Sequence, residues 1–166
     1  MRYMRIITTC TILAVLFALA ATGAIYAADA KGELTFSASL FNPDAGSMVW
    51  SGTGEYLFPL GDSTFLFGPS ISLFDGGGFD GGAAGVAAEF NFGKKCGPGI
   101  GGAAHKLTGD AADQADYTYE ARAFFKCGSE HAFVKFTASQ VWSKAESGAT
   151  TDPDGTSVQG GLGWRF

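Results

Sequence analysis

The chain has 166 residues, 25 of them glycine and 15 phenylalanine, and its formal net charge is −5 at pH 7. Its length suits a single domain, and its acidic balance argues against nucleic-acid binding, which needs a basic surface to meet the phosphates. Glycine is roughly twice as frequent as in average proteins, and glycine combined with abundant aromatic residues favours β-structure with tight turns over helices.

Residues 1–27 have the pattern of a secretory signal peptide. Arg2 and Arg5 come before an apolar run, and small residues follow that run. We expect cleavage near Ala27, with Ala30 as the second choice. An uncleaved membrane anchor is the alternative, but the apolar run is shorter than the ~20 residues that a spanning helix needs. Removal of this segment takes Arg2 and Arg5 but no acid, so the formal charge changes from −5 to −7.

The remaining residues, 28–166, form the expected mature domain. Clusters of glycine, proline, aspartate and asparagine divide it into eight segments, each close to the ~10 residues of a tilted membrane strand. The connections alternate between short turns and longer loops rich in aspartate and glycine, which is typical of barrels whose strands run up and down in sequence order. The expected strands are residues 32–41, 48–58, 63–74, 82–92, 97–107, 116–126, 132–144 and 156–166.

Side chains in seven of these segments alternate between two sets with a period of two. One set, which includes Leu34 and Phe36, contains no Asp, Glu, Lys or Arg. Because a charge at the midplane of a bilayer costs ~2–4 kcal/mol, we expect this set to face lipid. A soluble β-sandwich that buries the same apolar face in its core is the alternative. Segment 97–107 has few informative side chains, and we expect Ile100 to face outward and His105 inward.

Aromatic residues of the outward set fall at two heights, one at the turn ends of the strands and one nearer the loop ends. Two such girdles are expected at the two interfaces of a membrane. The turn-side group is Phe58, Phe65, Phe92, Phe125, Trp164 and Phe166, and the loop-side group includes Trp50, Tyr117, Tyr119 and Trp142.

The inward set predicts a lumen filled by polar side chains. The interior of an eight-stranded barrel is just wide enough for side chains to fill, so charges placed there need partners. Three acids and three bases balance one another, and we expect a network of ion pairs and hydrogen bonds with Glu120 and Arg122 at its centre. The six residues are Glu55, Glu89, Glu120, Arg122, Lys135 and Arg165.

Cys96 and Cys127 are the two cysteines that follow the signal peptide. The fifth and sixth strands meet at the loop 108–115, so the start of the fifth and the end of the sixth are neighbours in an up-and-down barrel. An oxidising periplasm permits a bond between these two cysteines, and we predict a disulfide. Two free thiols are the alternative.

Motifs of catalysis are scarce in this sequence. His105 and His131 are its only histidines, and their expected positions, near the loop side and in a turn, do not allow them to share a site. The sequence contains no zinc-protease motif, no nucleophile elbow and no phosphate loop. We therefore expect no catalysis, no metal and no cofactor. The loops are rich in aspartate, which most simply keeps the rim solvated; bridging to lipopolysaccharide phosphates through divalent cations is a functional alternative.

The stretch 156–166 alternates strictly and ends on Trp164, Arg165 and Phe166. It resembles the closing strand of bacterial outer-membrane β-barrels. By this signature and by its pattern, the whole of residues 32–166 resembles the small outer-membrane barrel family that includes the OmpA transmembrane domain and OmpX-like proteins. The resemblance implies an all-β, eight-stranded antiparallel up-and-down transmembrane β-barrel, too narrow for a general pore, with both termini in the periplasm.

The same resemblance implies partners and a role. An integral outer-membrane protein of this family contacts outer-membrane lipids and lipopolysaccharide, and the barrel-insertion machinery reads its closing aromatic residues, here Trp164 and Phe166. The implied role is structural or in surface interaction, without catalysis. Two other classes stay open. A lipid A-modifying outer-membrane enzyme needs an outward His or Ser beside a carboxylate near the outer rim, and a soluble periplasmic or secreted β-barrel would bind a small apolar ligand.

Overall fold

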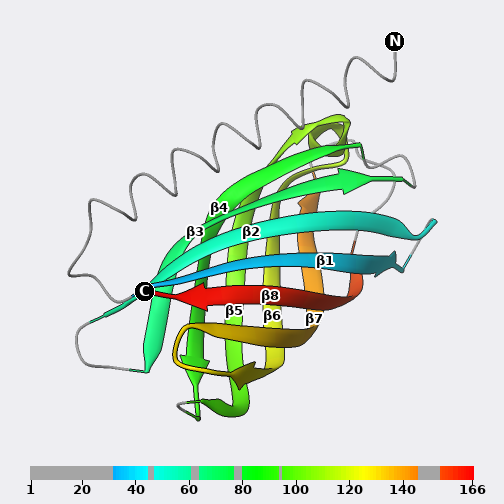
Figure 1. The fold of residues 1–166 in the computed structure, drawn as a ribbon. Helices are drawn as coiled ribbons and strands as arrows, with labels where there is room; N and C mark the ends of the chain where they lie inside the picture. Colours follow the sequence, from blue (N-terminus) through cyan, green and yellow to red (C-terminus); the bar gives the residue numbers. More distant parts are fainter. Residues whose placement is uncertain (1–31, 45–46, 61–63, 77–79, 94, 146–153) are drawn as a thin grey trace, which may run out of the picture. The chain divides into compact units, whose positions relative to one another are not determined.

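The computed structural model describes residues 32–44, 47–60, 64–76, 80–93, 95–145 and 154–166. The predicted signal peptide and both predicted cleavage sites lie outside the described residues. Most of the described residues belong to β-strands (Figure 1). Within this part of the chain, no helix is long and apolar enough to cross a membrane.

Eight strands follow one another, each antiparallel to the next, and β8 pairs with β1 to close the sheet into a barrel (Figure 1). The predicted all-β, eight-stranded antiparallel up-and-down barrel is therefore confirmed, and each strand begins and ends within two residues of its predicted bounds. The strands are β1 (Glu33–Pro43), β2 (Val49–Pro59), β3 (Phe65–Asp75), β4 (Gly81–Asn91), β5 (Cys96–Gly109), β6 (Ala115–Gly128), β7 (Ala132–Ala145) and β8 (Gly155–Arg165).

Alternation along each strand sends polar side chains into the barrel and apolar ones out of it. On β6, Arg122 and Lys126 are each 4% exposed, whereas Phe125, which lies between them in the sequence, is 49% exposed. On β5, Ile100 is 55% exposed and His105 is 6% exposed, which matches their predicted directions. Buried charges beneath an exposed aromatic surface reverse the arrangement of a water-soluble domain.

The lumen also contains apolar side chains, which gather at its loop end. A short 3-10 helix, η1 (Asp110–Asp113), joins β5 to β6 in the predicted loop 108–115, and its Ala111 is fully buried. Ala111 packs against Val49 and Leu107, and Phe41 and Phe74 lie against the same cluster, which also contains Ala83 and Ala115. The mouth at the loop end is therefore narrowed by apolar side chains.

Candidate functional site

Eight charged side chains inside the barrel form one continuous chain of ion pairs in which acids and bases alternate. Arg165 Nε lies 2.9 Å from Glu33 Oε1, and Lys126 Nζ lies 3.3 Å from Glu89 Oε2. Lys126 also pairs with Glu33. The ion-pair chain therefore starts at the turn-side rim, where β8 ends and β1 begins, and runs into the lumen. In order, its members are Arg165, Glu33, Lys126, Glu89, Lys135, Glu55, Arg122 and Glu120.

The inner half of this ion-pair chain is more deeply buried than the half that begins at the rim. Lys135 pairs with Glu89 and lies 3.3 Å from Glu55 Oε2. Arg122 pairs with Glu55 through Nη1 and with Glu120 through Nη2, which lies 2.7 Å from Glu120 Oε2. These side chains have little contact with solvent, and the side chain of Arg122 alone is only 1% exposed. Isolated charges at such sites are costly, so the strict alternation of four acids with four bases is what makes their burial possible.

The ion-pair chain connects opposite walls of the barrel. Three of its acids come from β1, β2 and β4, whereas all four bases come from β6, β7 and β8. Lys126 and Lys135 lie directly opposite each other on β6 and β7, a position in which like charges repel. Glu89 reaches both lysines from β4 and compensates this repulsion. Each of these three acids therefore pairs with a base on β6 or β7, so that the contacts tie the two walls together, whereas Glu120 lies on β6 beside its partner Arg122.

Aromatic rings surround the cations at the turn-side half of the lumen. Lys126 Nζ lies 4.8 Å from the centre of the Phe133 ring, and Arg165 Cζ lies at the same distance from that ring. Lys135 Nζ lies 5.0 Å from the centre of the Phe124 ring. Such cation–π contacts favour a cation that has lost its water. Both rings are buried, and they partly replace solvent around the bases.

The structure places all six lumen residues predicted from the sequence in this ion-pair chain. Glu120 and Arg122 form its loop-side end, so the prediction that they lie at its centre is wrong; the central pairs join Glu89, Lys135 and Glu55. Sequence reasoning missed Glu33 and Lys126. Both lie at the ends of predicted strands, where alternation from the outward Leu34 and Phe125 would have directed them inward.

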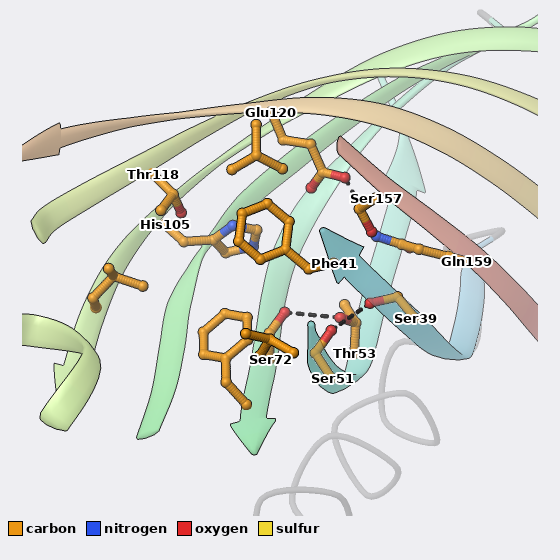
Figure 2. Close-up of a pocket in the computed structure, with 14 residues that line it drawn as sticks. Ser39, Phe41, Ser51, Thr53, Ser72, His105, Thr118, Glu120, Ser157 and Gln159 are labelled. Atoms are coloured by element: carbon orange, nitrogen blue, oxygen red, sulfur yellow. Dashed lines mark hydrogen bonds between the residues drawn. The ribbon is translucent and has the colours of Figure 1, made fainter. Parts of the chain in front are cut away.

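A cavity of about 60 Å³ lies on the loop side of the ion-pair chain. Its walls are rich in hydroxyl groups, and Figure 2 shows the hydrogen bonds that link Ser39 to Ser51 and Thr53 to Ser72. This volume suits a few water molecules. The lining residues are Ser39, Phe41, Val49, Ser51, Thr53, Ser72, Phe74, His105, Leu107, Thr118, Glu120, Val141, Ser157 and Gln159.

The polar groups of this cavity are held by one another. His105 Nε2 lies 2.9 Å from Ser70 Oγ, which donates a hydrogen bond of 3.4 Å to Glu55. Gln159 donates a hydrogen bond of 3.3 Å to the carboxylate of Glu120. His105 therefore contacts a buried hydroxyl inside the barrel and lies on the opposite face from the outward-facing side chains. Among the described residues, no group of three or more His, Cys, Asp and Glu side chains could hold a metal ion.

Cys96 and Cys127 are opposite each other in the pairing of β5 with β6 and form a disulfide at the turn ends of these strands. We expect the protein, denatured without reductant, to resist alkylation at Cys96 and Cys127, and to gain two alkyl groups there after reduction. Intact-mass measurement of the two samples checks this. Full labelling of both thiols without reductant would rule the bond out.

Trp164 and Phe166, the predicted insertion signal, lie at the turn end of β8. Trp164 is 43% exposed and Phe166 is 59% exposed. The Trp164 ring lies 6.2 Å from the ring of Phe36 on the neighbouring strand β1. Both residues therefore belong to the outward aromatic surface, away from the ion-pair chain.

Comparison with known proteins supports the fold. Neither the protein-family models nor the curated proteins contain a match to this chain. The chain is similar to a solved structure, the crystal structure of the N-terminal β-barrel domain of Pseudomonas aeruginosa OprF, with a TM-score of 0.53 and 17% sequence identity. The similarity covers 82% of this chain and 99% of that one. At this identity the likeness is one of fold: the chain shares the architecture of that β-barrel domain.

Proposed function

We propose that this protein is an integral bacterial outer-membrane β-barrel with a side-chain-filled lumen, which serves a structural or surface-interaction role and has no catalytic activity. The observation that carries the proposal is the reversed distribution of its side chains. Phe136 is 63% exposed and Leu162 is 56% exposed, whereas Glu89 is 1% exposed. Water would disfavour this arrangement, but a bilayer around the barrel solvates the apolar surface and leaves the charges enclosed.

The dimensions of the outward surface support the same proposal. Two rows of cross-strand neighbours mark the ends of this surface. One row passes through the disulfide at the turn end of β5, and the other passes through Lys106, ten residues later in the same strand. At ~3.3 Å per residue and a tilt of ~40°, these two rows are separated by about 25 Å along the barrel axis. This height equals that of the apolar band of outer-membrane barrels. Aromatic residues such as Phe125 and Tyr119 lie just inside the two rows.

The filled lumen supports a structural role over that of a pore. The ion-pair chain and the apolar mouth leave a cavity of about 60 Å³ on the loop side. A barrel with this interior is suited to a compact, stable scaffold rather than to a wide pore. In the proposed orientation the turn ends lie in the periplasm, together with the start of β1 and the end of β8. The loops and the outward surface then meet lipopolysaccharide and membrane lipids, and Trp164 and Phe166 contact the barrel-insertion machinery.

Cell fractionation with a detergent gel tests the proposal. The protein should sediment with the outer membrane and resist extraction by sodium carbonate. It should also migrate at different positions before and after boiling, because a folded barrel binds less detergent than its unfolded chain. Recovery in the soluble periplasmic or culture fraction, with one mobility in both samples, would support the soluble barrel instead.

A further inference from the structure

Two lysines interrupt the apolar outward surface at one place. Among the strand residues whose alternation directs them outward, the only charged ones in the described part of the chain are Asp75, Lys106 and Lys144. Both lysines are exposed, and neither ammonium has a carboxylate oxygen within 4.0 Å among the described residues. Both charges therefore lie on the outer surface of the barrel wall.

Strand pairing puts the two lysines in one row. Lys106 on β5 is opposite Tyr117 on β6, and the same Tyr117 is opposite Lys144 on β7. With ~4.8 Å between neighbouring strands, the two lysine Cα atoms are about 10 Å apart and the tyrosine stands between them. Lysine side chains are long and flexible, so both ammonium groups can reach one anion at the centre of this row. The Tyr117 hydroxyl adds a hydrogen-bond donor.

The row lies at the height of lipid headgroups, given the membrane orientation proposed above. The row directly beneath it contains Tyr119 on β6 and Trp142 on β7, which face each other and are 48% and 44% exposed. Tyrosine and tryptophan at such positions mark the interface between lipid chains and headgroups. The lysine row is one step further from the bilayer centre, where a basic side chain can meet an anionic headgroup.

We propose that Lys106, Tyr117 and Lys144 form a binding site for a phosphate group of lipid A in the outer leaflet. This inference rests on the proposed function, because it requires the loop ends of the strands to face the outside. The site has two cations for a phosphate and a tyrosine donor between them. The aromatic row below it, Tyr119 and Trp142, offers apolar surface to the acyl chains of the same lipid. The site thus recognises an amphiphile through both of its parts.

Native mass spectrometry of the folded full chain in detergent tests the site, with diphosphoryl lipid A as the probe. The Lys106→Gln/Lys144→Gln variant should bind lipid A roughly 30-fold more weakly, and each single variant roughly fivefold more weakly, since a lysine near a charged headgroup contributes about 1 kcal/mol. The Lys106→Arg/Lys144→Arg variant should retain binding. Lipid A without its phosphates should bind wild-type protein and the double glutamine variant equally.

The matched control is Lys95→Gln, which removes an exposed lysine from a turn at the opposite end of the barrel and should leave lipid A binding unchanged. Equal lipid A binding by the wild type and the double glutamine variant would overturn the site, and so would a phosphate-independent difference between them. The heat-dependent gel shift of each sample separates the two proposals. Protein that shows the shift but no lysine dependence refutes the site alone, whereas protein without the shift and absent from membranes refutes the membrane barrel itself.

Discussion

Replacement of Arg122 by methionine is expected to lower the free energy of unfolding by about 3–5 kcal/mol, the range measured when one partner of a buried ion pair is removed. Methionine keeps much of the apolar stem but supplies no charge. Glu120 then loses its cationic partner, and Glu55 keeps only Lys135, at 3.3 Å. The cost arises because Glu120 keeps the hydrogen bond from Gln159 but has no cation to compensate the water that its carboxylate has lost.

Removal of Glu120 together with Arg122 should cost less than removal of Arg122 alone. These two residues are the loop-side end of the ion-pair chain, so the double variant Arg122→Met/Glu120→Gln leaves a shorter chain that still alternates and ends on Glu55. The shorter chain contains three acids and three bases and is again neutral. If acids and bases alternate along the ion-pair chain, the double variant should therefore lose less free energy of unfolding than the single variant does.

Urea titrations of the folded protein, followed by tryptophan fluorescence, measure both variants. Glu130→Gln is the matched control, because Glu130 pairs with Lys95 at 3.1 Å on the surface, where the two side chains are 73% and 66% exposed. Exposed pairs of this kind contribute ~0–1 kcal/mol. If Arg122→Met shifts the unfolding midpoint no further than Glu130→Gln does, the buried ion-pair chain does not stabilise the barrel.

Ala123→Arg is expected to destabilise the barrel in phospholipid vesicles by about 2–4 kcal/mol. Ala123 is exposed on the outward face of β6, and its cross-strand neighbours are Ile100 on β5 and Ala138 on β7. Its row lies between the two aromatic levels of the outward surface, close to the middle of the proposed apolar band. An arginine there must either enter hydrocarbon or deform the bilayer around it, whereas in water the same substitution would add a harmless surface charge.

Ala132→Arg is the control for this prediction. Ala132 is the first residue of β7, is also exposed on the outward face, and is opposite Trp164 at the turn-side rim. At the membrane edge, the cost of arginine falls to ~0–1 kcal/mol. Urea titrations of the two variants in the same vesicles give the difference directly. Equal stabilities for the two variants would contradict a lipid-facing surface and favour a soluble barrel.

The sequence by itself determined which face of each strand each side chain occupies. Alternation with a period of two is a local property of extended backbone, so it can be read without knowledge of the partners. The number and order of strands follow from turn residues, and they also bring Cys96 next to Cys127. Even the direction of His105 in the weakly patterned fifth strand follows from alternation.

Only the tertiary structure decided which charges meet across the lumen. Contacts such as Glu89 with Lys126 and Lys135 depend on the closure of the barrel and on the relative heights of strands that are far apart in the sequence. Alternation assigns a face but no height, so it predicted a network without its order and placed Arg122 and Glu120 at the centre instead of at one end.

The inward aromatic rings show the same limit. Phe133 fits inside because Gly163 on the neighbouring strand has no side chain; a Cβ there would lie 2.2 Å from the ring. The residue that makes room for a ring is found only once the strands are in register.

The lysine row depends on register as well. Lys106 and Lys144 are 38 positions apart in the sequence, and their shared partner Tyr117 emerges only from the pairing of three strands. Local geometry therefore determined the faces of this barrel, and register determined its sites.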